Sequence, residues 1–147
     1  MTPHVLQDYK NLTKADALRL VMEMWSWLAE DSSRVKYNWP RWIENGGDIP
    51  FFENDCATCE YSLQNTHSCS DCILPWRNGH CTEGEHKDWK EAKTNEDKSK
   101  AALAIVSLAE RELNKLWNER DKALQSCLDT IRDAKNEDLK ENRYTYN

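Results

Sequence analysis

The chain has 147 residues, a net charge of −6 and a pI of about 5.3, and its mean hydropathy is −0.91. This length suits one domain with a modest core, and no apolar run approaches the roughly 20 residues of a membrane-spanning helix. The opening "MTPHVLQDYK" has no apolar stretch typical of a secretory signal. We therefore predict a single domain (1–147) in a reducing cytosol, where closely spaced cysteines more often bind metal than form disulfides.

The segment 13–30 is predicted to be an amphipathic helix that follows a partly ordered arm (1–12). Thr13 and Asp16 have the spacing of a capping box, in which each side chain accepts a hydrogen bond from the other's amide. Apolar residues then recur at steps of three and four, as one helix face requires. Trp27 lies off this apolar stripe, so it must pack elsewhere or stay exposed, and we take it as a candidate partner-binding residue.

Residues 31–93 are predicted to be an irregular region rich in tryptophan and cysteine. The part from 31 to 55 has two prolines, a Gly-Gly pair and no sustained period. Because it is long for an unstructured loop, we expect its aromatic residues to anchor it: Trp39, Trp42, Phe51 and Phe52. A short helix is expected at about 85–93.

A long helix is predicted over 94–136, followed by a frayed tail (137–147). Thr94 and Asp97 offer a second capping box, and neither glycine nor proline interrupts the chain afterwards. Cys127 is expected to be a small buried residue. The expected apolar stripe is Leu103, Val106, Ala109, Leu113, Leu116, Leu124, Cys127, Leu128 and Ile131. The predicted fold is therefore mainly α, with the N-terminal helix and the long C-terminal helix packed as a hairpin around an irregular, zinc-stabilised loop region.

Five of the six cysteines lie in "CATCEYSLQNTHSCSDCILPWRNGHC". Cys56 and Cys59, and again Cys69 and Cys72, have the C-x2-C spacing that directs two sulfurs at one tetrahedral zinc ion. Cys81 is a fifth candidate and could replace Cys69 or Cys72. An iron–sulfur cluster would accept the same thiolates, but the spacings match neither common ferredoxin pattern. His67, His80 and His86 are further candidates, although each is more simply a loop residue.

The zinc ion is predicted to be structural. Between Glu44 and Glu85 the only lysine or arginine is Arg77, against eight acidic residues. Such a segment buries too little apolar surface to fold alone, and metal binding supplies folding free energy to segments of this kind. A site of four cysteine thiolates has no open coordination position, so we predict no hydrolytic chemistry there.

The chain resembles a loose group of small cysteine-rich proteins encoded by bacteriophages and prophages. The features that carry this resemblance are a helix with tryptophans near its end, the loop Trp39-Pro40-x-Trp42, the clustered cysteines and the downstream Trp89. This resemblance spans about residues 14–120. It implies an accessory protein made in the bacterial host cytoplasm that acts on host or defence proteins. It implies no catalytic residues.

Three functions compete at this stage. The first is a protein-binding factor that inhibits or redirects a bacterial host or defence protein. The second is a nucleic-acid-binding zinc module, which the scarcity of basic residues disfavours, although an acidic surface could imitate nucleic acid. The third is a metal-dependent hydrolase or nuclease built on "HCTEGEH", which lacks the H-E-x-x-H spacing. We predict no enzyme.

The long helix has more apolar length than the first helix can cover. We therefore expect Leu124 and Leu128 to bind a partner, which is either a second copy of the chain or the target protein. The alternative is that the N-terminal arm, with Val5, Leu6 and Tyr9, folds back over them.

Overall fold

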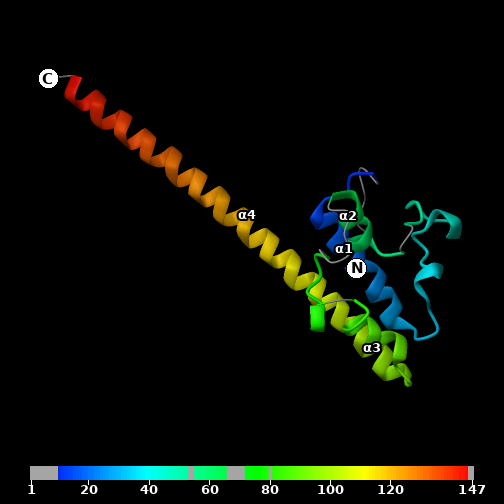
Figure 1. Ribbon diagram of the computed structural model, residues 1–147. Coiled ribbons are helices and arrows are strands. Elements are labelled where there is room, and N and C mark those ends of the chain that lie inside the picture. Colours follow the sequence, from blue (N-terminus) through cyan, green and yellow to red (C-terminus); the bar gives the residue numbers. More distant parts are fainter. Residues whose placement is uncertain (1–9, 53–54, 66–71, 80, 146–147) are drawn as a thin grey trace. The chain divides into compact units, whose positions relative to one another are not determined.

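The computed structural model describes residues 10–52, 55–65, 72–79 and 81–145, with side chains as far as Leu139 (Figure 1). These residues form the helices α1 (Lys14–Glu30), α2 (Ala57–Asn65), α3 (Glu85–Glu91) and α4 (Asn95–Thr145), together with three short 3-10 turns. They contain no β-strand, and one isolated parallel bridge joins Trp42 to Ile49. The predicted mainly helical fold is confirmed. The cysteine Cys69, the histidines His67 and His80, and most of the predicted arm lie outside the described residues.

The described structure divides into two compact units. The first unit comprises residues 1–113 and the second comprises residues 114–147. Helix α4 supplies the end of the first unit and the described part of the second. None of the helices in the described ranges is long and apolar enough to cross a membrane.

Helix α1 begins at the predicted capping box. The Asp16 amide donates to Thr13 Oγ1 at 3.0 Å, and the Thr13 amide donates to Asp16 Oδ2 at 3.2 Å. The predicted stripe of α1 is buried, and it extends to Leu20. Local sequence therefore determines where this helix begins and which face it buries.

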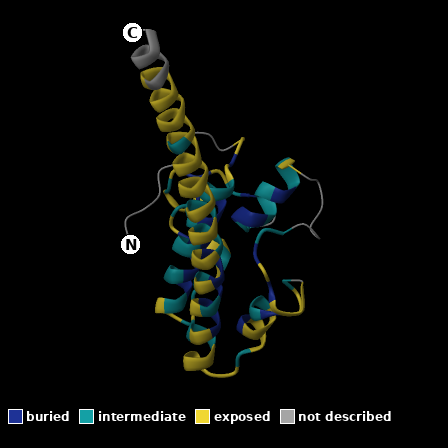
Figure 2. Ribbon diagram, turned by 90° about the vertical axis from the view of Figure 1, so that its left-hand side faces the viewer, coloured by how far each residue is buried: buried dark blue, intermediate teal, exposed yellow. Residues whose placement is uncertain are grey.

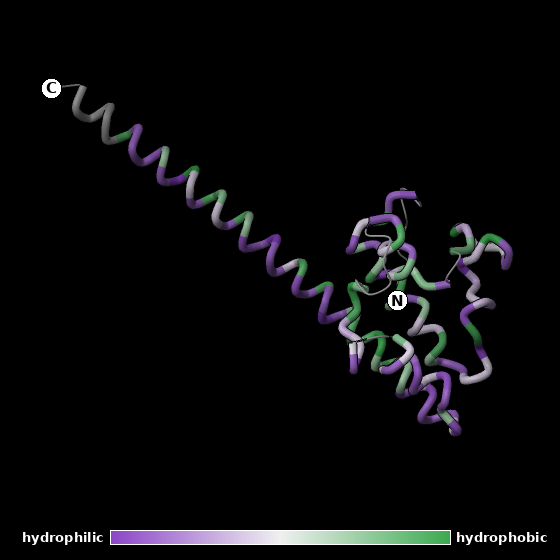
Figure 3. The backbone as a smooth tube through the Cα atoms, viewed as in Figure 1, coloured by the Kyte–Doolittle hydropathy of each residue, from purple (hydrophilic) through white to green (hydrophobic). Residues whose placement is uncertain are grey.

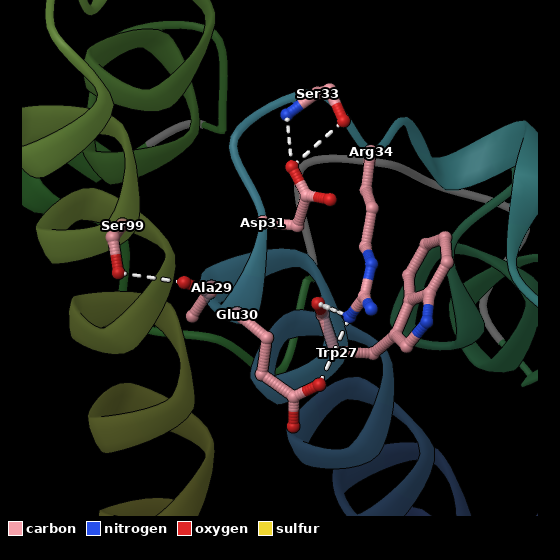
Figure 4. A network of polar contacts seen from close by, with 7 residues as sticks. All are labelled: Trp27, Ala29, Glu30, Asp31, Ser33, Arg34 and Ser99. Atoms are coloured by element: carbon pink, nitrogen blue, oxygen red, sulfur yellow. Dashed lines mark hydrogen bonds and ion pairs between the residues drawn. The ribbon is translucent and has the colours of Figure 1, made fainter.

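The end of α1 packs against the beginning of α4 within the first unit. Ser99 Oγ donates to the carbonyl oxygen of Ala29 at 2.7 Å (Figure 4), and Ser32 Oγ donates to Asn95 Oδ1 at 2.7 Å. At the start of α4 the Asp97 amide donates to Thr94 Oγ1 at 3.1 Å, which is one of the two hydrogen bonds expected of the second capping box. The two serine contacts join the predicted N-terminal and C-terminal helices.

The buried face of α4 differs from the prediction. Leu103 was expected on the apolar stripe but is 52% exposed. The buried residues in this part of α4 are mostly small: Ala101, Ala102, Ile105, Leu108 and Ala109. Alanine lets α4 approach the large side chains of the core closely, so packing rather than hydrophobicity selects the buried face.

The loop from 31 to 52 is held by its aromatic residues, as predicted. Trp39, Trp42 and Phe52 are buried, and Phe51 packs partly buried against the core. The Ile43 amide donates to the Ile49 carbonyl oxygen at 2.8 Å, so the loop folds back on itself. Its backbone groups therefore find partners without a sheet or a long helix.

Helix α2 was not predicted, because the first C-x2-C pair was interpreted only as a pair of zinc ligands. It lies inside the region expected to be irregular and packs against α1. The Leu12 amide donates to Gln64 Oε1 at 2.9 Å and ties the start of α1 to α2. This long-range contact has no local sequence signal.

The second unit is helical as far as Thr145, so the helix continues through the segment expected to be a frayed tail. The absence of glycine and proline from this segment accounts for its length. Figure 2 shows the helix yellow, for exposed, along most of this length. Cys127 is exposed here, so the prediction of a buried cysteine is wrong for the single chain.

Candidate metal centre

The described cysteines of the cluster come from three segments of the first unit. Cys56 lies directly before α2 and Cys59 lies within its first turn. Cys72 lies four residues before Trp76, which directly precedes the 3-10 turn Arg77–Gly79, and Cys81 lies before α3. All four are partly buried, and neither they nor Cys127 form a disulfide. Cys69 was a candidate ligand but lies outside the described residues.

The thiols of Cys56 and Cys59 interact directly. Hydrogen bonding by Cys59 lowers the pKa of Cys56 to about 6, and the same interaction raises the pKa of Cys59. Cys56 Sγ also lies 3.1 Å from Thr58 Oγ1. The first C-x2-C pair is thus a closely coupled pair of sulfurs at the start of α2.

Cys72 and Cys81 lie near this pair. The charges of Cys72 and Cys81 contribute to raising the pKa of Cys59. Burial raises the pKa of Cys81 most, and the charges of Cys56 and Cys72 raise it further. The fold therefore brings together four thiols that are as many as 25 positions apart in the chain.

A lysine and a histidine border the cysteine cluster. His86 was a further candidate ligand, whereas sequence reasoning did not assign Lys36 to the cluster. Lys36 Nζ lies 2.9 Å from Asp55 Oδ1 and 3.2 Å from His86 Nε2. The charge of Lys36 makes a small contribution to the lowered pKa of Cys56. It also opposes the burial that raises the pKa of Cys81. In the sequence, charges were counted only between Glu44 and Glu85. Lys36 lies eight positions before Glu44, so it was not included.

His86 packs among tryptophans. Its ring centroid lies 5.6 Å from that of Trp25, 6.0 Å from that of Trp89 and 6.3 Å from that of Trp76. The pKa of His86 is lowered to about 4, first by burial and then by the charges of Lys36 and Lys90. The imidazole is therefore neutral near pH 7, and Nε2 accepts a hydrogen bond from Lys36.

In the part of the chain that the structure describes, no group of three or more His, Cys, Asp or Glu side chains has the arrangement of a metal site. The four thiols are near one another without converging on one point. Their number, their partial burial and their mutual interactions nevertheless match the donor set that a structural zinc ion uses.

The candidate partner-binding residue Trp27 lies in the first unit and is partly buried. The Arg34 guanidinium lies 4.8 Å from the centroid of the Trp27 ring, and Arg34 Nη1 donates to the Trp27 carbonyl oxygen and to Glu30 (Figure 4). Trp27 also lines a pocket of about 230 Å³ with Trp39, Pro40 and other residues. The candidate residues Leu124 and Leu128 belong to the second unit, where they are 59% and 50% exposed.

No protein-family model, no curated protein and no solved structure matches this chain. The class of protein therefore has to be inferred from the chain's own residues.

The pKa of His86 predicts a pH dependence of stability. An unfolded histidine binds a proton near pH 6.5, whereas folded His86 binds one only near pH 4. Between these values the unfolded chain holds more protons, so stability falls as the pH falls. With allowance for solvent screening of the partly buried ring, the loss between pH ~7.5 and ~5 is about 1–2 kcal/mol.

The variant His86→Gln tests this prediction, because glutamine keeps an acceptor for Lys36 and does not titrate. Urea unfolding at the two pH values should show a smaller loss of stability in the variant than in the native chain. Equal losses in the two proteins would show that His86 does not cause the pH dependence.

Proposed function

We propose that this chain is a protein-binding factor. Its first unit is stabilised by a cysteine-bound structural zinc ion, and its second unit presents an apolar helix face to another protein. The observation that carries the proposal is the exposure of Leu124, Leu128 and Ile131, which are each 50–59% exposed.

These three residues lie on one face of the helix. Their spacings of four and three residues keep them within about 60° of one another at 100° per residue. Figure 3 shows hydrophobic segments recurring among hydrophilic ones along this part of α4. A helix gains most of its stability from packing an amphipathic face, so this face fits a helix–helix or helix–groove contact with a protein.

The charges around this face favour a protein over a nucleic acid. Acidic and basic side chains alternate here, and Arg132 Nη2 pairs with Asp129 Oδ1 at 3.0 Å. Mixed charges of this kind flank helix–helix contacts, whereas nucleic-acid binding requires a basic face. The resemblance to phage accessory proteins suggests a bacterial host or defence protein as the target.

The double variant Leu124→Glu/Leu128→Glu tests the proposal. Tagged native protein incubated with bacterial lysate should retain one dominant protein, and the double variant should retain less than about a tenth of it, since each buried leucine contributes about 1.5–3 kcal/mol. Leu103→Glu is the matched control, because Leu103 is an exposed leucine of α4 in the first unit. Equal capture by all three proteins, or capture of nucleic acid alone, would contradict the proposal.

A second copy of the chain is the other occupant that the exposed face allows. Light scattering at micromolar concentration should then give about twice the chain mass of 17.3 kDa. A mass near 17.3 kDa would exclude the dimer and leave the target protein as the occupant.

A further inference from the structure

We propose that Cys56, Cys59, Cys72 and Cys81 are the four ligands of one zinc ion. This inference rests on the structural zinc proposed above and names its ligands. It uses both cysteines of the first C-x2-C pair and one cysteine of the second. Cys81 takes the place of Cys69, which regular pairing of the two motifs would have favoured.

A continuous series of contacts connects the segments that carry these cysteines. Trp76 Nε1 donates to Cys72 Sγ at 3.4 Å, and the Trp76 ring packs at the edge of the His86 ring. His86 Nε2 in turn contacts Lys36 Nζ, and Lys36 pairs with Asp55, the residue before Cys56. The loop that carries Cys72 and the start of α2 are therefore held on one side of the first unit.

Cys81 is held close to the same place by the turn that precedes α3. The Arg77 amide donates to Glu85 Oε2 at 3.0 Å, and Arg77 Nη2 pairs with Asp88 at 2.8 Å. A Cβ on Gly84 would lie 2.6 Å from the Arg77 carbonyl oxygen. The backbone before Cys81 and the backbone after it therefore lie close to each other. Cys72 and Cys81 both pack against the hydrophobic core.

Two of the four sulfurs have hydrogen-bonding groups beside them. The indole N–H of Trp76 donates to Cys72, and the Thr58 hydroxyl is within hydrogen-bond distance of Cys56. Donors of this kind stabilise metal-bound thiolates and orient them. The Lys36 ammonium, placed between Asp55 and His86, adds positive charge near Cys56 and Cys81.

Binding requires the four sulfurs to move closer together, because no three of them now form a metal site. Three short segments carry them, and each sulfur is already partly buried. Zinc binding supplies free energy for such closure, since metal binding and local folding are coupled in sites of this kind. A tetrahedral structural site takes four ligands, so these four thiols complete it.

Zinc content of the purified full-length chain tests the ligand set. The native protein, Cys69→Ser and Cys127→Ser should each contain about one zinc ion per chain. Each serine variant of the four proposed ligands should lose most of this zinc. The pair Cys69→Ser and Cys81→Ser is decisive: loss of zinc in the first with retention in the second would overturn the proposal.

Cobalt substitution and a histidine variant separate a lost ligand from a misfolded chain. Cys81→His should still bind one metal ion, with a weaker thiolate-to-cobalt charge-transfer band than Cys69→Ser, because one thiolate is replaced by imidazole. Equal bands in the two variants would contradict ligation by Cys81. The absence of zinc from the purified native protein would overturn this inference. Protein binding is tested separately, by the lysate experiment with the variant Leu124→Glu/Leu128→Glu.

Discussion

Replacing Trp42 with alanine is expected to lower the free energy of unfolding of the first unit by about 4 kcal/mol. Trp42 is 1% exposed. Its ring centroid lies 5.2 Å from that of Trp39, 5.0 Å from that of Phe51 and 5.4 Å from that of Phe52. The substitution removes a large buried surface and leaves a cavity that the surrounding rings cannot close.

The substitution also removes a polar contact. Trp42 Nε1 donates to the Lys36 carbonyl oxygen at 2.9 Å. Alanine cannot donate this hydrogen bond, so the Lys36 carbonyl oxygen loses the contact. Because Lys36 borders the cysteine cluster, we expect Trp42→Ala to weaken zinc retention as well as stability.

Denaturant unfolding followed by circular dichroism measures the effect of Trp42→Ala. Tyr37→Ala is a suitable control, because Tyr37 lies in the same loop, contacts Phe51 at the ring edge and is 64% exposed. Its expected cost is about 1 kcal/mol or less. Similar losses in the two variants would show that the aromatic cluster does not hold the loop.

Gly47→Ala is expected to destabilise the first unit by about 3 kcal/mol. A Cβ at position 47 would overlap the backbone carbonyl groups of Arg41 and Pro40. The backbone cannot yield easily there, because the Gly47 amide donates to the Trp42 carbonyl oxygen and the Ile49 amide donates to the Arg41 carbonyl oxygen, both at 2.9 Å. The loop must therefore open to admit one methyl group.

Gly46→Ala separates this clash from backbone strain. Gly46 has a φ of +93°, and no atom lies within 4 Å of the position that its Cβ would take. Alanine there meets only the cost of the left-handed conformation, about 1–2 kcal/mol. Thermal unfolding of the two variants compares the effects directly, and a larger loss for Gly46→Ala would contradict the predicted clash.

The helices with local signals were predictable from the sequence. The reciprocal pair of Thr13 and Asp16 determines where α1 begins, and apolar residues at steps of three and four determine which face it buries. The absence of glycine and proline indicated the length of α4, although the helix extends beyond its expected end to Thr145. Local interactions determine such features, so a short stretch of sequence contains them.

Other features depend on contacts between distant residues. The helix α2 is tied to the start of α1 through Gln64 and Leu12, which are 52 positions apart. Leu103 is exposed because the small residues of α4 pack on the core in its place. Neither outcome follows from periodicity, because each depends on the shape of a surface that distant segments build.

The candidate metal centre combines both kinds of information. The sequence by itself determined that five cysteines gather at short spacing in an acidic segment with one basic residue. Only the tertiary structure decided that Cys72 and Cys81 lie near the first pair, and that Lys36, Trp76 and His86 border them. The physical reason is that spacing constrains sulfurs within one turn, whereas charges and hydrogen-bond donors from other segments reach the cluster only after the chain has packed.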